Sequence, residues 1–425
     1  MSTRIEDYAL LSDCRTAALV SREGSIDWFC APRLDSASVF GALLGDEDHG
    51  CWSLRPADPA ATATRRYDGD TFTLVTRWEC ADGVAEVRDW MPVAGDPDAP
   101  GGRDRTDLVR QVVGLRGRVG FVQELRLRFD YARALPWVRQ IGTPAAPALL
   151  AVAGPDAVVV RGGALRAHGH AHSGALVVGE GETAALTLTW HPSYRPVPSP
   201  LDLVAAARET HDWWHDWAGL IARHDQDGRY HGAVRRSRLI LRALTNRETG
   251  GIAAAATTSL PEDFGGERNW DYRYVWLRDA ALTLEALLDH GIVAEAVHWR
   301  DWLLRAVAGD PADVQIMYGL AGERDLAERS VTSLPGYEAS APVRIGNGAS
   351  DQYQADVLGE VMVTLAAARR AGLSESRRSW ALETALLRHA ETRLDRPDNG
   401  LWEIRGEPQF FTHSRVMMWA AFDRG

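Results

Sequence analysis

The first half of the chain alternates apolar and polar residues over short segments. Residues 71–80 and 84–93 alternate in this way on either side of an Ala-Asp-Gly turn. Residues 15–20 and 25–30 do the same around an Arg-Glu-Gly turn. Alternation that resumes after a tight glycine-containing turn predicts a β-hairpin in both places.

Further short strands are expected before residue 200. Residues 175–178 and 184–190 flank a Gly-Glu-Gly-Glu turn at 179–182, which predicts another hairpin. Regularly punctuated strands without intervening helices predict an antiparallel β-sandwich over residues 1–200. The Gly-, Pro- and Asp-rich segment 94–107 is expected to form a surface loop.

After residue 200 the apolar residues recur at helical spacing. Four prolines in residues 191–200 indicate a stiff connector, and a helix over 201–224 makes 201–228 a linker. Within 229–425 the periodicity predicts six helices, at residues 234–244, 276–288, 292–307, 353–368, 380–394 and 416–422. Ser374 is the expected N-cap of the fifth helix, and Ala371-Gly372 the expected end of the fourth.

Long loops separate the pairs of predicted helices and hold most of the unusual residues. Helix pairs with short turns on one side and long loops on the other are typical of an (α/α)6 toroid, whose long loops surround a central pocket. Six helices make up half of such a barrel. We therefore expect residues 229–425 to be its N-terminal half, and the chain to be incomplete at its C-terminus.

Composition narrows the function classes. The chain has 58 acidic and 47 basic residues and a formal charge of −11, which argues against a nucleic-acid partner. We find no basic start followed by an apolar run and no apolar stretch of about 18 residues, so we expect no export signal, no membrane span and a cytoplasmic location. The four cysteines are then expected to be reduced. The 16 tryptophans favour carbohydrate binding, because indole has the largest stacking area.

The segment 265–287 is the first candidate for a ligand site. Its loop half contains Trp270, Tyr272, Tyr274 and Trp276 together with Asp271, Arg273, Arg278 and Asp279. Aromatic rings cover the apolar faces of a sugar, while neighbouring arginine and aspartate residues bond its hydroxyls. The segment therefore predicts the floor of a pocket for a polyhydroxylated ligand. A well-packed junction between loop and helix is the alternative.

Two other loops carry candidate chemistry. In residues 398–406, Glu403 has large apolar neighbours, and burial against them would raise its pKa into the range of a general acid. Arg405 would oppose that shift if it pointed at the carboxylate. In residues 334–347, Tyr337, Glu338 and Arg344 are expected to line a pocket, with a structural role as the equal alternative.

Two groups of histidines have the spacing of metal ligands. His168, His170 and His172 alternate, but the surrounding glycines favour a solvated hairpin over a zinc site. His211 and His215 lie one helical turn apart, where aromatic neighbours favour a packed helix. We predict no metal site.

Longer motifs resemble a known family. NWDYRYVWLRDAALTLEAL (269–287), PGYEASAPVRIGN (335–347), GLWEIRG (400–406) and FTHSRVMMWAAFDR (411–424) are similar, in this order, to glycoside hydrolase family 15. This family groups glucoamylases, glucodextranases and a bacterial trehalase branch. IEDYALLSDCRTAALVSREGSIDWFCAPRLDS (5–36) likewise resembles the N-terminal sandwich of its bacterial members. The resemblance implies a β-sandwich followed by an (α/α)6 barrel.

The resemblance also implies a reaction, the inverting hydrolysis of an α-glucosidic bond in trehalose or short α-gluco-oligosaccharides. The residues it assigns are the general acid Glu403, the hydroxyl-binding pair Arg278 and Asp279, the wall residues Tyr272 and Trp276, and Leu401 and Trp402, whose backbone carbonyl oxygens accept hydrogen bonds from the substrate. No cofactor is expected, except that membership of the trehalase branch would imply phosphate and magnesium.

One part of the family pattern has no match. The general base of relatives is a glutamate beyond the last motif, so we expect little hydrolysis by residues 1–425 alone. A disaccharide phosphorylase on a similar fold and a non-catalytic sugar-binding protein are the alternatives. The choice of α-glucoside and the oligomeric state are left open.

Overall fold

A computed structural model describes residues 2–93, 104–222, 229–307 and 313–425. The chain forms two compact units. Unit 1 comprises Met1–Ala218, Ser259–Asn269 and Val331–Val343, and unit 2 comprises Gly219–Thr258, Trp270–Ser330 and Arg344–Gly425. Two short segments from the second half of the chain thus belong to unit 1. The domain limits 1–200, 201–228 and 229–425 stay a prediction.

In the described part of unit 1, fifteen antiparallel strands form one hydrogen-bonded sheet. The strands are β1 (Ala9–Ser12), β2 (Ala17–Val20), β3 (Ser25–Cys30), β4 (Ser38–Phe40), β5 (Cys51–Pro56), β6 (Thr62–Tyr67), β7 (Leu74–Cys80), β8 (Gly83–Trp90), β9 (Thr106–Arg126), β10 (Trp137–Thr143), β11 (Ala146–Ala153), β12 (Asp156–Arg161), β13 (Arg166–His168), β14 (Ala171–Gly179) and β15 (Thr183–Pro192). The short turn α1 (Phe129–Ala132) follows β9, and α2 (Leu203–Ala222) follows β15.

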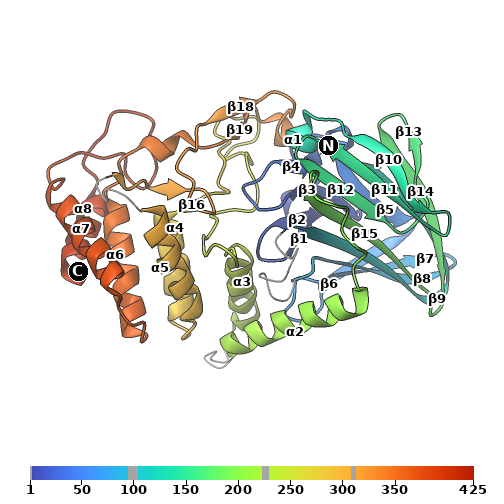
Figure 1. The fold of residues 1–425 in the computed structure, drawn as a ribbon, viewed down its shortest axis with the longest axis horizontal. Helices are drawn as coiled ribbons and strands as arrows, with labels where there is room; N and C mark the ends of the chain where they lie inside the picture. Colours follow the sequence, from blue (N-terminus) through green and yellow to red (C-terminus); the bar gives the residue numbers. More distant parts are fainter. Residues whose placement is uncertain (1, 94–103, 223–228, 308–312) are drawn as a thin grey trace. The chain divides into compact units, whose positions relative to one another are not determined.

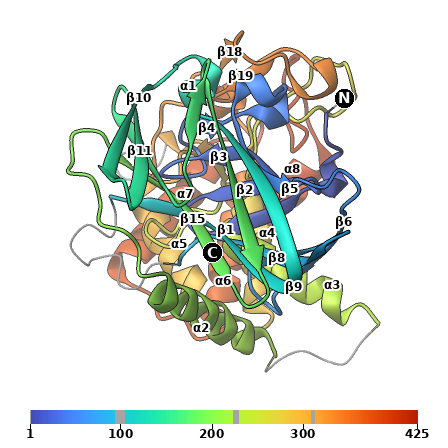
Figure 2. The ribbon, with the colours of Figure 1, turned by 90° about the vertical axis from the view of Figure 1, so that its right-hand side faces the viewer.

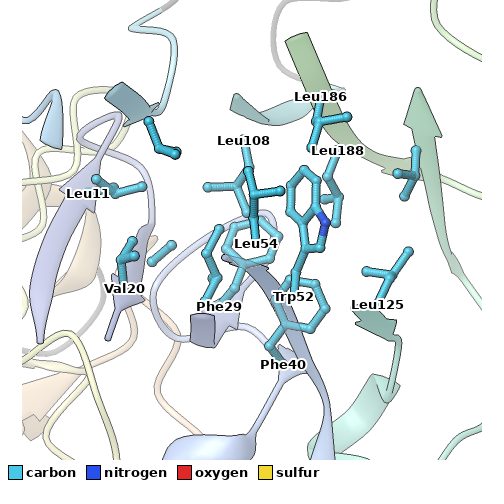
Figure 3. Packing of buried hydrophobic residues seen from close by; sticks show 14 of the residues in the cluster. Leu11, Val20, Phe29, Phe40, Trp52, Leu54, Leu108, Leu125, Leu186 and Leu188 are labelled. Atoms are coloured by element: carbon cyan, nitrogen blue, oxygen red, sulfur yellow. The ribbon is translucent and has the colours of Figure 1, made fainter. Parts of the chain in front are cut away.

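The 21-residue strand β9, the long strand in Figure 2, joins the two parts of this sheet. Its first half pairs with β8 and β15, and its second half pairs with β5 and β14. Both parts contribute to one hydrophobic core, in which Phe29 and Trp52 from one part lie close to Leu186 and Leu188 from the other (Figure 3). The predicted antiparallel β-sandwich is confirmed.

The predicted hairpins β2–β3 and β7–β8 are confirmed. The hairpin predicted around residues 179–182 is wrong, because β14 and β15 each pair with β9 instead of with one another. They follow one another along β9, opposite residues 118–125 and 106–113, so the chain bends there without reversing its direction. Most of the predicted surface loop, residues 94–103, lies outside the described residues.

The three alternating histidines lie in the hairpin of β13 and β14, which turns at Gly169. His168 and His170 are exposed and His172 is half-buried, so the prediction of a solvated hairpin is confirmed.

A buried ion pair joins neighbouring strands of unit 1. Arg110 on β9 donates to the Asp89 carboxylate on β8 at 2.8 Å, and both side chains are essentially inaccessible to solvent. Arg110 also donates to the carbonyl oxygens of Trp52 and Gly24, at 2.6 and 2.7 Å. One guanidinium therefore links four segments of unit 1, and its charge depends on Asp89 for compensation.

The helices of unit 2 are α3 (His231–Ala243), α4 (Leu277–Leu288), α5 (Ala294–Ala306), α6 (Asp356–Arg370), α7 (Arg377–Glu391) and α8 (Thr412–Arg424). They correspond to the six predicted helices, with ends shifted by a few residues. The short strands are β16 (Val275–Trp276), which pairs with β17 (Met317–Tyr318), and β18 (Arg329–Val331), which pairs with β19 (Val343–Ile345). No described helix has both the length and the apolar character that a membrane span requires.

Helix ends follow local side-chain chemistry. Ser376 caps α7 and accepts a hydrogen bond from the Ser379 N–H, so the prediction of Ser374 as the cap is wrong by two residues. The predicted end of α6 at Ala371-Gly372 is confirmed, because Gly372 adopts a φ of +98°. Within unit 2, α6 packs against both α4 and α8, as Figure 1 shows.

We expect Asp89→Ala to destabilise unit 1 by about 3–5 kcal/mol, because it leaves the guanidinium of Arg110 buried without a countercharge. Glu79→Ala is the matched control, since Glu79 pairs with Arg77 at the surface, and it should change stability by less than about 0.5 kcal/mol. Guanidinium-induced unfolding followed by tryptophan fluorescence measures both. A loss of unfolding free energy below about 1 kcal/mol for Asp89→Ala would contradict the claim that Asp89 compensates the buried charge of Arg110.

Candidate active site

Glu403 lies in the loop between α7 and α8. The loop is closed at its base by Asp398 and Gln409, whose N–H and C=O groups bond one another at 2.8 Å in both directions. The buried Asp398 carboxylate accepts a hydrogen bond from the Ala355 N–H at 2.9 Å and another from the Ser414 hydroxyl at 2.7 Å. The base of the loop is therefore attached to the beginnings of α6 and α8.

The backbone of this loop is held in an unfavourable conformation at Glu403, which has a φ of +55° although it carries a side chain. Gln352 donates from Nε2 to the carbonyl oxygens of Glu403 and Ile404, at 3.3 and 3.2 Å. At Gly400, where φ is +65°, a Cβ would lie 2.7 Å from the ring of Phe411. These contacts with the surrounding structure stabilise the strained backbone conformation at Glu403.

Trp276 provides the direct partner of Glu403. Its backbone is fixed where β16 pairs with β17, and its side chain is 1% exposed. The indole Nε1–H donates to Glu403 Oε1 at 2.5 Å. The Tyr272 ring lies 5.4 Å from the Trp276 ring at 45°. The structure therefore brings the proposed wall residues together beside the proposed acid.

Arg278, in the first turn of α4, lies at the centre of several polar groups. Its Nη2 is 3.3 Å from Asp279 Oδ2 and 3.6 Å from Glu403 Oε1. Its Nη1 donates to Gln354 Oε1 at 3.1 Å and lies 3.7 Å from Asp356 Oδ2. The Arg278 side chain is 15% exposed, so these charges interact in surroundings that screen them less than water does.

Burial raises the pKa of the Glu403 carboxyl, whereas the Trp276 hydrogen bond and the Arg278 charge act in the opposite direction. Arg405 does not point at this carboxylate. Its Nη2 lies 3.1 Å from Glu328 Oε2, and its guanidinium stacks 4.4 Å from the Trp270 ring. The sequence left open whether Arg405 approaches the Glu403 carboxylate. In the structure, Arg278 is the arginine that lies close to it.

Part of the segment 265–287 is structural. Arg273 and Asp271 form a bidentate pair at 2.8 and 2.7 Å, and neither side chain is exposed. Trp270 is stacked on by Arg344 as well as by Arg405. Trp270, Asp271 and Arg273 thus form the packed junction between loop and helix that was the alternative for this segment. The candidate site is surrounded by Tyr272, Trp276, Arg278 and Asp279.

The remaining predicted site residues fall in two places. Leu401 and Trp402 precede Glu403 in its loop, where Leu401 is half-buried and Trp402 is 77% exposed. Tyr337 and Glu338 belong to unit 1, where the buried Tyr337 hydroxyl donates to the Thr3 carbonyl oxygen at 3.1 Å. Glu338 is exposed and has a φ of +48°. The binding roles of these four residues stay predictions.

Sequence reasoning assigned no role to a group of three polar residues near Arg278. Asp356 and Glu360 are buried on α6, and His413 on α8 lies 3.9 Å from Asp356 and 3.7 Å from Glu360. Burial, followed by the charge of Asp356, raises the pKa of Glu360 to about 7. One signal was available, because residues four apart in a predicted helix share a face.

Metal binding has no support in the part of the chain that the structure describes. No group of three or more His, Cys, Asp or Glu residues there is arranged to hold a metal ion. His211 and His215 instead stack on one another along α2, with ring centroids 6.0 Å apart.

Comparison with protein families gives two matches. Residues 228–425 match the model of glycosyl hydrolases family 15, and residues 1–140 match the model of the trehalase-like N-terminal domain. The chain is 36% identical to a trehalase of Mycolicibacterium smegmatis over 99% of its own length and 65% of the relative. It is 30% identical to a trehalase of Thermoplasma acidophilum over 95% of its own length and 68% of the relative. The chain thus spans about two thirds of these proteins.

A solved structure, bacterial glucoamylase complexed with acarbose, aligns with 95% of this chain and 60% of its own, with a TM-score of 0.63. At 10% identity this likeness concerns the fold alone. It agrees with the predicted combination of an antiparallel sheet domain and a helical domain.

Glu360→Gln is expected to flatten the pH dependence of stability between about pH 4.5 and 7. Folded Glu360 keeps its proton up to about pH 7, whereas in the unfolded chain the group ionises near 4.5. Rising pH therefore favours the unfolded state of the wild type through this window, by at most about 3 kcal/mol. Scanning calorimetry at half-unit pH steps should show the wild-type Tm falling relative to that of the variant.

The exposed Glu391→Gln provides the control, because it removes the same charge without relieving burial. Equal pH slopes for the wild type and Glu360→Gln would contradict the prediction.

Proposed function

This chain belongs to glycosyl hydrolases family 15, and we propose on that premise that the cluster around Glu403 hydrolyses an α-glucosidic bond with inversion. The observation that carries the proposal is the placement of Glu403. Its carboxyl group is withdrawn from solvent, accepts the Trp276 N–H at 2.5 Å and lies 3.6 Å from the Arg278 guanidinium. A carboxyl group in such surroundings suits a general acid.

The hydrogen bonds indicate which oxygen of Glu403 carries the proton. Oε1 accepts from Trp276 and faces Arg278, so both donors favour electron density on that atom. The proton of the neutral acid then resides on Oε2. From Oε2 it is transferred to the glycosidic oxygen as the bond to the anomeric carbon breaks, and the Glu403 carboxylate that remains is stabilised by both donors.

Arg278 and Asp279 are proposed to hold the glucose unit. The Asp279 side chain is 40% exposed, and its carboxylate can accept bonds from two adjacent hydroxyls. Arg278 supplies donors from the same helical turn. Tyr272 and Trp276 form the apolar wall beside them, and Leu401 and Trp402 contribute backbone carbonyls. Substrate-binding roles for Tyr337 and Glu338 stay predictions from the sequence.

We propose trehalose or a short α-gluco-oligosaccharide as the substrate, because both relatives compared above are trehalases. Inversion also requires a carboxylate about 6.5–9.5 Å from the acid to activate water. The proposal assigns that base to no residue in 1–425. A cytoplasmic location, which is a prediction from sequence, agrees with a small soluble α-glucoside.

The first test assays this protein with trehalose, maltose, isomaltose and maltotriose. Proton NMR should show equal amounts of α- and β-glucose as the first products of trehalose, because the leaving glucose keeps its α configuration, and β-glucose from the non-reducing end of the other three sugars. Glu403→Gln is expected to lower kcat by about 10²–10⁴-fold, while binding of the glucose mimic 1-deoxynojirimycin persists. Wild-type binding without turnover of any of the four sugars would instead support a sugar-binding protein, and α-glucose without β-glucose as the first product of trehalose would exclude inversion.

Trp276→Phe tests the hydrogen bond to the acid. The indole N–H stabilises the ionised carboxylate, so its loss should raise the pKa of Glu403 and move the basic limb of kcat/KM to higher pH. Trp302→Phe is the matched control, since its buried indole donates to the Leu320 carbonyl oxygen at 3.0 Å. An equal shift of the basic limb of the kcat/KM pH profile in both variants would rule out a specific effect of Trp276 on Glu403.

A further inference from the structure

Two edges of the Arg278 guanidinium face different partners. Nη2 faces Asp279 and Glu403, which belong to the proposed reaction site. Nη1 faces Gln354 and Asp356 at the beginning of α6. The direction in which Arg278 presents Nη2 therefore depends on what holds Nη1.

Asp356 is unusual among the acids near Arg278. It is 0% exposed, and within the described residues neither of its carboxylate oxygens has a hydrogen-bond partner. Its ion-pair distances are 3.7 Å to Arg278 and 3.9 Å to His413. Burying a carboxylate without hydrogen bonds is costly, so structural stability is a poor explanation for this residue.

Helix capping does not account for Asp356 either. The N-cap of α6 is Ala355, which makes no side-chain capping bond, and the N–H groups of Val357, Leu358 and Gly359 in the first turn donate nothing to the Asp356 oxygens. The position nevertheless favours a negative charge, because the amino end of a helix carries partial positive charge. Burial raises the pKa of Asp356, and the charges of Arg278 and His413 counteract that effect.

We propose that Asp356 is a positioning residue, which holds Nη1 of Arg278 by charge so that Nη2 stays directed at Asp279 and Glu403. This inference rests on the proposed function of that cluster. Asp356 does not touch the substrate and takes no part in proton transfer. Without its charge, Arg278 is free to move towards Glu403, where it favours the ionised form of the acid.

Several charged or titratable groups surround Asp356 and enter its electrostatics. They are Arg278 on α4, Glu360 on α6, His413 on α8, and Asp398 in the loop before α8. Arg278 is the one of these that contacts both Asp356 and Glu403. The effect of Asp356 on the acid is therefore transmitted through this guanidinium.

The test uses Asp356→Asn, which keeps the shape and removes the charge, and Asp356→Glu, which restores the charge. For Asp356→Asn we expect kcat/KM to fall about 10–100-fold and its basic limb to move to lower pH. Asp356→Glu should recover part of both. Glu295→Gln is the matched control, because Glu295 is a buried carboxylate on α5 that pairs with Arg242 at 3.3 Å. It should lower Tm without moving the limb.

A readout that does not need turnover keeps the two proposals distinguishable. Carbon-13 NMR of protein labelled at the glutamate carboxyl carbons follows the titration of Glu403 directly, and Glu403→Gln assigns its signal. The Glu403 midpoint should fall in Asp356→Asn and return towards the wild-type value in Asp356→Glu. An unchanged midpoint, or an equal shift in Glu295→Gln, would overturn the positioning role. Absence of turnover in the wild type with a shifted midpoint would refute the proposed reaction alone.

Discussion

The guanidinium of Arg278 is the charge on which the candidate site depends. It lies within 4 Å of Glu403, Asp279 and Asp356 and donates to Gln354, in surroundings that exclude most water. Three carboxylates this close would repel one another strongly at neutral pH without a cation between them. The ionisation of Glu403 and Asp279 and the burial of Asp356 therefore all depend on one side chain, whose position is set by the first turn of α4.

The rest of unit 2 supports this arrangement from several segments. Asp398 attaches the base of the Glu403 loop to α6 and α8, and Gln352 holds the carbonyl oxygens at its tip. Trp276 is fixed by the pairing of β16 with β17 and reaches Glu403 from the other side. A glutamate with a φ of +55° persists only where such contacts outweigh the conformational cost. The loop is thus ordered by its neighbours more than by its own sequence.

Local patterns were sufficient for most of the fold. The six helices of unit 2 and the hairpins β2–β3 and β7–β8 follow from periodicity and turn chemistry, which act over a few residues. The hairpin at 179–182 failed because β14 and β15 both pair with β9, a strand that ends more than forty residues earlier in the chain. Alternation of apolar and polar residues indicates that a segment is a strand, but it does not indicate which other strand the segment pairs with. The N-cap of α7 differed only by two residues, since several serines compete there.

The sequence alone determined the family, the two kinds of secondary structure, and Glu403, Arg278 and Asp279 as candidates, because long motifs retain their order and spacing. Tertiary structure alone decided which charged residues act together. It paired Asp271 with Arg273 in the interior, turned Arg405 towards Glu328, and placed Asp356 behind Arg278. These outcomes depend on burial and on distances of 2.7–3.7 Å, in the last two cases between residues far apart in the chain. Electrostatic interactions change steeply over such distances, and residue spacing along a sequence does not encode them.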